Sequence, residues 1–308
     1  MSSASRIAIV GAGLMGKGIA QAFALAGHDV SLFDPDAETL AQAPESIADS
    51  LRELGYAPLD PARLQCHSSL GAAVRAADMV FECAPERLEL KRRIFAELGK
   101  EAPADAVLAS NTSVIPISRI SEGLGCAPRL LGTHWWNPAH LVPLVEVVPT
   151  ARTEPSIVQR TLDLLASIGK SPVRLKQDIA GFVGNRLQFA LWREAQSLVA
   201  AGVCDARTLD AIVKTSFGPR LAVLGPMENA DLIGLDLTLE ITRIVTPDLS
   251  HTVAPNPLLQ RLVAAGRLGF KTGSGFREWT PESIAECRRR LALHLKRAFG
   301  TTTHSTTE

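Results

Sequence analysis

One stretch near the start of the chain restricts the fold more than any other feature. The β-branched run RIAIV at residues 6–10 leads directly into GAGLMG at 11–16, and an apolar-periodic segment continues to residue 26. This is the G-x-G-x-x-G pattern between a strand and a helix. The first glycine permits a tight turn, the second lets the backbone approach a pyrophosphate, and the third lets the helix pack closely on the strand. We therefore predict a unit that binds a dinucleotide at the N-terminus of its first helix.

An acidic residue at the end of the next predicted strand indicates which dinucleotide binds. Residues 29–33 form this strand, and Asp34 follows it, about twenty residues beyond the glycines, as dinucleotide-binding folds require. Its carboxylate would accept hydrogen bonds from ribose hydroxyls and repel a 2′-phosphate, which favours NAD over NADP. The same carboxylate could instead cap the following helix, and the sequence leaves this alternative open. The cofactor contacts predicted here are Gly11, Gly13, Leu14, Met15, Gly16 and Asp34.

Strands and helices alternate over the first 178 residues. Helices are predicted at 36–55, 88–99 and 155–169, and further strands at 64–68, 77–83, 106–109, 129–134, 141–148 and 172–175. This alternation predicts an α/β fold with a doubly wound, Rossmann-type, mostly parallel sheet. Beyond it, only helices are predicted, at 182–201, 205–216, 232–245, 261–268 and 281–299. We expect an NAD-binding domain at 1–178, an all-α C-terminal domain at 179–300 and a disordered tail at 301–308.

The segment RLLGTHWWNPAHLVPLVEVV at 129–148 indicates the chemistry. Two apolar runs flank an Asn-Pro turn; the first ends at His134, and the second carries one charge, Glu146. A carboxylate in an apolar strand is costly to bury without a partner, and His134 is the nearest candidate. An imidazole held by a carboxylate is a general base with a fixed tautomer. The alternative, a core histidine beside a surface glutamate, stays open. A metal site that also uses His140 is not expected, because the spacing fits no ligand motif.

Polar residues follow two other predicted strands. Ala84-Pro85-Glu86 comes after 77–83, and the sequence SNTS at 110–113 comes after 106–109. Ligands of open parallel sheets bind at the carboxyl ends of the strands, so Glu86 and SNTS should border the cofactor. The SNTS segment is equally suited to capping the next short helix, and the sequence does not decide between these roles.

Composition and charge exclude several classes of partner. Basic and acidic residues balance at 32 each, so no electrostatic reason exists to expect nucleic acid or an anionic membrane. Five scattered cysteines form no C-x-x-C pair, which argues against zinc knuckles and disulfide frameworks and fits a reducing compartment. No apolar run approaches ~18 residues, and the first strand begins too early for a signal peptide. We expect a cytoplasmic protein.

Seven blocks, in order, resemble the 3-hydroxyacyl-CoA dehydrogenase family over almost the whole chain. They are GAGLMGKGIA, ECAPERLELK, SNTS, HWWNPAHLVPLVEVV, GFVGNR, GPMENADLIGLD and GFKTGSGF. The resemblance implies an NAD-dependent dehydrogenase that oxidises a short (S)-3-hydroxyacyl-CoA such as 3-hydroxybutyryl-CoA. It also implies a homodimer formed through the helical domain, which closes over the active site.

The resemblance also implies a role for individual residues. His134 matches the catalytic base, Glu146 the acid that orients it, and Ser113 and Asn185 the side chains that hold the substrate oxygen. The further cofactor contacts that it implies are Glu86, Lys91, Ser113, Asn137 and Lys271. Asn185 and Lys271 rest on the resemblance alone.

Departures from the family pattern bear on the substrate. The usual Phe-Phe after the histidine is Trp135-Trp136 here, and no lysine lies between Lys17 and Lys91, where members acting on coenzyme A esters tend to carry lysines. RLAVLGP at 220–226 is more like the branch acting on free compounds, and the following ADLIGLD is more like the acyl-CoA branch. The alternative substrate is therefore a CoA-free hydroxy acid, sugar acid, carnitine-like compound or hydroxymethylpyridine alcohol. A non-catalytic NAD-binding protein is the remaining alternative, although a pure binder needs no base.

Overall fold

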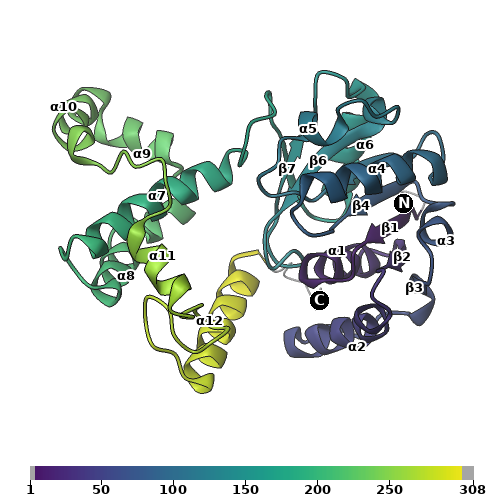
Figure 1. Ribbon diagram of the computed structural model, residues 1–308, viewed down its shortest axis with the longest axis horizontal. Coiled ribbons are helices and arrows are strands. Elements are labelled where there is room, and N and C mark those ends of the chain that lie inside the picture. Colours follow the sequence, from purple (N-terminus) through teal and green to yellow (C-terminus); the bar gives the residue numbers. More distant parts are fainter. Residues whose placement is uncertain (1–3, 300–308) are drawn as a thin grey trace, which may run out of the picture. The chain divides into compact units, whose positions relative to one another are not determined.

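The computed structural model describes residues 4–299. These residues separate into two compact units, one of residues 4–185 together with 292–299 and the other of residues 186–291. The first unit is α/β and the second is helical, in agreement with the predicted fold class (Figure 1). The predicted tail at 301–308 lies outside the described residues.

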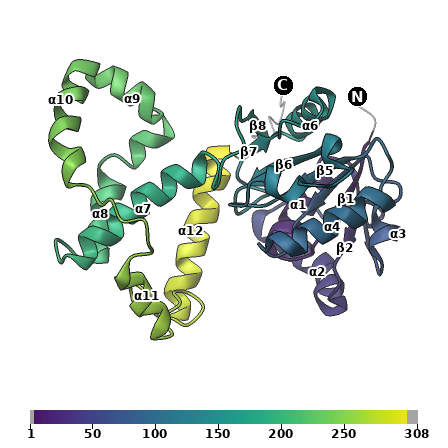
Figure 2. The same cartoon turned by 45° about the horizontal axis from the view of Figure 1, so that its top comes forward.

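An eight-stranded sheet forms the centre of the first unit, in the order β3-β2-β1-β4-β5-β6-β7-β8. Its strands are β1 (Arg6–Val10), β2 (Asp29–Phe33), β3 (Leu64–His67), β4 (Met79–Glu82), β5 (Val107–Ser110), β6 (Leu130–Trp135), β7 (Leu144–Val148) and β8 (Ser171–Arg174). Figure 2 labels β1, β2, β5, β6, β7 and β8 of these strands. Every neighbouring pair is parallel except β6 and β7. The predicted doubly wound, mostly parallel sheet is confirmed. The strand order reverses at β1, which lies between β2 and β4, and sheets of this kind bind ligands at that switch point.

Helices cover both faces of this sheet. On one face lie α1 (Leu14–Leu25), α2 (Ala37–Leu54) and α6 (Pro155–Ser167), and on the other lie α3 (Leu70–Val74), α4 (Leu88–Glu101) and α5 (Ile117–Ser121). Side chains alternate along each strand, so Ile7 and Ile9 of β1 enter the first core while Ala8 and Val10 enter the second. Burial on both faces explains why the central strands β1, β4 and β5 are nearly continuous apolar runs.

The reversal between β6 and β7 determines the register of the predicted base. After Trp135 the chain passes through the loop 136–143, which contains a cis peptide bond between Asn137 and Pro138, and returns as β7. In the resulting antiparallel pair, His134 lies directly opposite Glu146. Directly opposed residues project from the same face of the sheet, with Cβ atoms about 5 Å apart.

The second unit is built from helices. Its elements are α7 (Gly184–Ala200, which begins in the first unit), α8 (Ala206–Thr215), α9 (Pro226–Ile233), α10 (Leu235–Val245), α11 (Pro257–Ala264) and the first part of α12 (Pro281–Phe299). The prediction of one helix over 232–245 was wrong, because Gly234, with φ 101°, ends α9 and begins α10. Within residues 4–299, none of the helices combines the length and apolar character needed to cross a membrane.

Candidate active site

The glycine turn between β1 and α1 leaves open space at the start of the helix. A Cβ on Gly11 (φ 110°) would lie 2.8 Å from the carbonyl oxygen of Cys83, and one on Gly16 would lie 1.8 Å from that of Gly11. The fold itself therefore requires these two glycines. A Cβ on Gly13 would meet nothing within 4 Å. Gly13 is also the N-cap of α1, which has no side-chain cap. Its open cradle and the helix N-terminus fit the pyrophosphate of a dinucleotide.

Asp34 lies beside this turn at the end of β2. Its Oδ2 accepts a hydrogen bond from the amide of Ala12 at 2.7 Å, and its Oδ1 accepts one from the amide of Asp36 at 2.9 Å. The cap of α2 is Asp36, whose side chain accepts from the amides of Glu38 and Thr39. The alternative that Asp34 caps this helix is therefore wrong. Its carboxylate is half-buried, and its role as a contact for the ribose hydroxyls stays a prediction.

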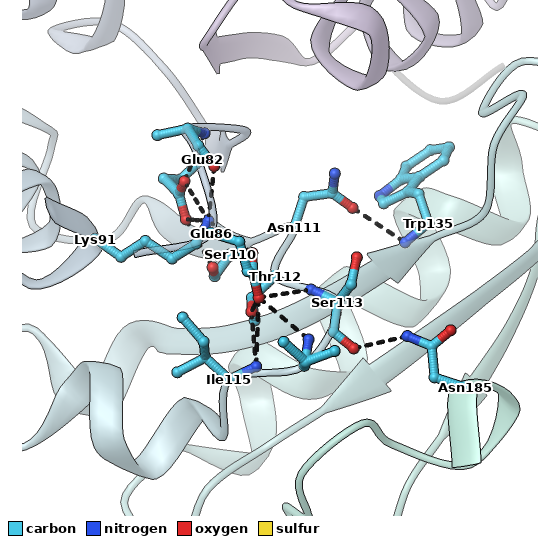
Figure 3. A network of polar contacts seen from close by, with 12 residues as sticks. Glu82, Glu86, Lys91, Ser110, Asn111, Thr112, Ser113, Ile115, Trp135 and Asn185 are labelled. Atoms are coloured by element: carbon cyan, nitrogen blue, oxygen red, sulfur yellow. Dashed lines mark hydrogen bonds and ion pairs between the residues drawn. The ribbon is translucent and has the colours of Figure 1, made fainter. Parts of the chain in front are cut away.

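A buried ion pair lies at the carboxyl ends of β4 and β5 (Figure 3). Lys91 Nζ donates to both carboxylate oxygens of Glu82, at 2.8 and 3.0 Å, and to the carbonyl oxygen of Ala84 at 3.0 Å. The hydroxyl of Ser110 donates to Glu82 at 2.7 Å. Because an ammonium has three donors, these protein acceptors engage all of them. The role of Lys91 as a cofactor contact stays a prediction. Its observed contacts are with the end of β4, and Glu82 joins this strand end to that of β5 through Ser110.

Glu86 organises the turn that carries Ser113. Its Oε1 accepts from the hydroxyl of Thr112 and from the amides of Ser113, Val114 and Ile115, the three amides lying 3.2 to 3.4 Å away (Figure 3). Several donors converging on one carboxylate oxygen make the turn tight and fix its orientation. Glu86 and Ser113, which the sequence predicted near the cofactor, therefore lie together.

The SNTS turn does not cap the helix that follows it. The amides of Ile117 and Ser118, at the start of α5, donate instead to the carboxylate of Asp178, at 3.0 and 2.6 Å. Asn111, within the turn, accepts from the amide of Trp135 at 3.1 Å (Figure 3). The capping alternative is wrong, and the turn is instead tied to the end of β6.

Asn185 lies beside the same turn, at the start of α7. Its buried Nδ2 donates to the carbonyl oxygen of Ser113 at 2.8 Å (Figure 3). The two residues that the resemblance assigned to the substrate oxygen are neighbours although 72 positions separate them in the sequence. No local pattern in the sequence indicates this contact.

His134 and Glu146 form the pair that the sequence predicted. His134 Nδ1 lies 2.7 Å from Glu146 Oε2, and both side chains are buried. The alternative of a surface glutamate is therefore wrong. Oε1 of Glu146 accepts from the amides of Val183 and Gly184 at 3.0 and 3.1 Å. These amides were missed, because backbone donors leave no mark in the sequence.

The surroundings of Glu146 determine the tautomer of His134. Burial alone would raise the pKa of Glu146, but the hydrogen bonds from His134 and from the two amides together hold it below its ordinary value. Glu146 is therefore ionised at neutral pH and can only accept hydrogen bonds. The proton of the neutral imidazole then lies on Nδ1, which leaves a lone pair on Nε2. That lone pair is what a general base requires.

Aromatic rings flank the imidazole of His134. The ring centroid of Trp136 lies 5.2 Å from that of His134, and the ring centroid of Phe182 lies 5.5 Å from it. Trp135 projects into the core instead, where its ring lies 6.0 Å from that of Phe23. The two tryptophans therefore have different roles: one packs in the core and one contacts the predicted base.

The remaining predicted cofactor contacts are distributed more widely. Leu14, which is 70% exposed, and Met15 begin α1 beside the glycine turn. Asn137 is exposed in the loop after β6, and Lys271 is exposed in the turn 269–275 of the second unit. Their contacts with a cofactor stay predictions. No group of three metal-ligating side chains occurs in the part of the chain that the structure describes.

Two family profiles cover most of the chain. The NAD-binding domain of 3-hydroxyacyl-CoA dehydrogenase matches residues 6–179, and the C-terminal domain of the same family matches residues 181–279.

Individual relatives are similar over most of their length. The 5-formyl-3-hydroxy-2-methylpyridine 4-carboxylate 5-dehydrogenase of Mesorhizobium japonicum is 36% identical over 94% of this chain and 95% of its own length. L-carnitine dehydrogenase of Streptomyces griseus is 37% identical over 80% of this chain and 79% of its own length. The 3-hydroxyadipyl-CoA dehydrogenase of Escherichia coli is 34% identical over 92% of this chain and 61% of its own length.

Solved structures give the same family. The crystal structure of 5-formyl-3-hydroxy-2-methylpyridine 4-carboxylic acid 5-dehydrogenase, an NAD⁺-dependent dismutase, has a TM-score of 0.89 at 33% identity and covers 96% of this chain and 99% of that one. That of 3-hydroxybutyryl-CoA dehydrogenase from Escherichia coli has a TM-score of 0.73 at 34% identity, over 90% of this chain and 60% of that one. The chain belongs to the 3-hydroxyacyl-CoA dehydrogenase family and is an NAD-dependent dehydrogenase acting on CH–OH groups.

Proposed function

We propose that this dehydrogenase oxidises the alcohol group of a small, CoA-free hydroxy compound and that His134 is its general base. The observation that carries the proposal is the hydrogen bond between His134 Nδ1 and the ionised, buried Glu146. It leaves Nε2 as the proton acceptor, at the carboxyl end of β6.

The proposed mechanism assigns one task to each side chain. His134 takes the hydroxyl proton at Nε2, and Glu146 stabilises the resulting imidazolium through Nδ1. The Ser113 hydroxyl donates to the substrate oxygen as it becomes a carbonyl. The Asn185 side chain donates its second amide N–H to the same substrate oxygen, because its first N–H already donates to the carbonyl oxygen of Ser113. A bound NAD⁺ would supply the acceptor for the hydride that leaves the carbinol carbon of the substrate. In the reverse direction His134 returns the proton.

The proposed cofactor site is built around the glycine turn. Backbone amides at the start of α1 would hold the pyrophosphate, and Asp34 would accept from the ribose hydroxyls, which is the basis for a preference for NAD over NADP. The further proposed contacts are Leu14, Met15, Glu86, Lys91, Ser113, Asn137 and Lys271.

Charge on α2 supports a substrate without coenzyme A. The family resemblance puts the nucleotide phosphates of coenzyme A near this helix, whose only cation is Arg52. Its acids are Glu38, Glu45, Asp49 and Glu53. Acidic residues in excess repel a phosphorylated nucleotide. The names of two relatives above, a pyridine carboxylate dehydrogenase and L-carnitine dehydrogenase, contain no coenzyme A.

Oxidation of a short (S)-3-hydroxyacyl-CoA is the second candidate. It is supported by the relative named 3-hydroxyadipyl-CoA dehydrogenase, which matches 92% of this chain, and by the acyl-CoA-like segment ADLIGLD at 230–236.

An assay of NAD reduction separates these candidates. Free 3-hydroxybutyrate, carnitine, a sugar acid and a hydroxymethylpyridine would be compared with 3-hydroxybutyryl-CoA, using kcat/KM as the measure. We expect a free compound to have the higher kcat/KM. A higher kcat/KM for the thioester would overturn the CoA-free proposal, and no NADH with any alcohol would overturn the dehydrogenase reaction itself.

We also propose that the second unit forms a homodimer. Of residues 186–291 only Gly275 is buried, so this unit has no core of its own. Its strongly exposed apolar side chains include Val203, Val223, Met227, Leu232, Ile244 and Val253. A folded unit needs buried apolar surface to offset its conformational entropy, and large exposed apolar patches mark protein interfaces. Sedimentation equilibrium should give twice the mass of the chain. A monomer at micromolar concentration would contradict the proposal.

A further inference from the structure

We propose that Trp136 and Gly184 are a matched steric pair that fixes the imidazole of His134 and limits the room beside it. Trp136 is then a positioning and specificity-determining residue. This inference rests on the proposed role of His134 as the base.

The space that a side chain would need at position 184 is filled by the indole of Trp136. A Cβ on Gly184 would lie 2.4 Å from Cζ2 of Trp136 and 3.3 Å from its Cε2 and Cη2. The edge of an indole is rigid and cannot yield as the end of a flexible chain would. Gly184 is helical, and its φ lies outside the left-handed region. Backbone conformation therefore does not require glycine here, whereas the position of the indole does.

Residues 183–184, which include the glycine beside the indole of Trp136, also bind Glu146, the partner of His134. The amides of Val183 and Gly184 donate to Oε1 of Glu146, whose Oε2 is bound to His134. Any displacement of residues 183–184 is therefore transmitted to the imidazole through this carboxylate.

Phe182, in the same segment, contacts the imidazole as well. Its side chain is fully buried and its ring centroid lies 5.5 Å from that of His134. Its backbone has φ 49°, a conformation that is unfavourable for a non-glycine residue. Glu146 at Nδ1 and the rings of Phe182 and Trp136 thus hold the imidazole, whose own exposure is 3%.

The size of the indole limits what can bind beside His134. A phenylalanine at position 136 would vacate the part of the ring that lies against Gly184. The indole Nε1 of Trp136 is buried and has no acceptor among the described residues. A buried donor without a partner destabilises the folded state. Replacement by phenylalanine removes this donor, so we expect Trp136→Phe to fold.

The test compares Gly184→Ala, Trp136→Phe and the double variant in the full-length protein. Gly184→Ala forces the indole or the 183–184 amides to move, and we expect kcat to fall by about 100-fold, the scale of an ångström misplacement. The dissociation constant of NADH, measured by fluorescence, should not change. In the double variant the added methyl group has room, so kcat should recover to that of Trp136→Phe.

Specificity gives a second readout. Trp136→Phe should raise kcat/KM for longer or bulkier 3-hydroxy compounds relative to a short free hydroxy acid by about tenfold, or 1.4 kcal/mol. The matched control is Gly125→Ala, because a Cβ there meets nothing within 4 Å and its φ is not positive. This control should behave as the wild type in every assay.

Specific outcomes would overturn the inference. A normal kcat in Gly184→Ala would show that Gly184 is not needed to make room for the indole of Trp136. The same conclusion would follow if the double variant were no more active and no more stable than Gly184→Ala. An unchanged substrate ratio in Trp136→Phe would overturn the specificity role. If His134→Gln keeps its activity, the proposed base is wrong. If it loses activity while Gly184→Ala is normal, only the steric pair is wrong.

Discussion

His134 and Glu146 meet across the antiparallel pair β6–β7, with 2.7 Å between Nδ1 and Oε2. A parallel β7 would begin at the opposite edge of the sheet, and its residues would meet β6 in another register. Because β6 runs parallel to β5, the imidazole lies at the carboxyl edge that also carries the SNTS turn. Because β7 begins where β6 ends, Glu146 lies beside it. This single antiparallel pairing, in a sheet whose other neighbouring strands are all parallel, brings the base and its acid together.

Two glycine substitutions should separate cofactor binding from folding. Gly13→Ala places a methyl group in open space, so the unfolding temperature should not change, whereas KM for NAD should rise by about tenfold or more, equivalent to 1.4 kcal/mol. Gly16→Ala meets the Gly11 carbonyl at 1.8 Å and should destabilise the fold by about 1–3 kcal/mol or more. Thermal unfolding with and without NADH measures both effects. If NADH raises the unfolding temperature of Gly13→Ala as much as that of the wild type, no phosphate of the cofactor lies over this residue.

Cofactor preference should depend on Asp34 and not on its neighbour. Asp34→Asn removes the charge that repels a 2′-phosphate, so the ratio of kcat/KM for NAD to that for NADP should fall. Asp36→Asn is the control, because asparagine caps helices as well as aspartate does and the cap of α2 is preserved. If the ratio of kcat/KM for NAD to that for NADP changes equally in both variants, the change reflects a less stable turn and not the lost charge of Asp34.

The buried Lys91–Glu82 pair should matter for stability. Lys91→Met leaves a buried carboxylate without its cation and should lower the free energy of unfolding by about 3–5 kcal/mol. The double variant with Glu82→Gln should be more stable than Lys91→Met alone. The partly exposed pair Arg63–Asp29 is the control, and Arg63→Met should cost less than about 1 kcal/mol. Urea unfolding gives all of these values, and a small loss in Lys91→Met would refute the structural role.

His140 should contribute to acid unfolding. Its burial, together with the nearby charge of Lys170, lowers the pKa of His140 from 6.5 to about 4. Between these pH values the unfolded chain binds a proton that the folded chain does not, so stability falls as the pH falls through this window. His140→Gln should lower the midpoint pH of acid unfolding, and the exposed His251→Gln should not change it. Identical midpoints for wild type and His140→Gln would contradict this assignment.

Residues whose environment is local or periodic could be predicted from the sequence. Gly11 and Gly16 are required by a turn formed by residues close to them in the sequence. Glu146 is recognisable because a single charged residue in an apolar strand needs a partner. Whether Asp34 caps the following helix could not be decided from the sequence, because the actual cap, Asp36, is another aspartate only two positions further on.

Contacts between distant backbone atoms could not be predicted. The amides of Val183 and Gly184 bind a carboxylate 37 and 38 positions away, and the backbone carbonyl of Ser113 accepts from Asn185. Backbone groups are the same in every residue, so no residue type indicates their use. The steric reason for Gly184 is likewise visible only once the indole of Trp136 is in place.

The central claim is that His134, held by Glu146, takes the proton of the alcohol. It is tested most directly by kcat and the NADH dissociation constant of His134→Gln and Glu146→Gln, with the exposed Glu154→Gln as control. We expect kcat to fall by about 10²–10⁴ in His134→Gln and to fall strongly in Glu146→Gln, whose amide no longer enforces the Nδ1–H tautomer. NADH binding should be unchanged in both variants, and the control should be fully active. Turnover close to wild type in His134→Gln would contradict the claim.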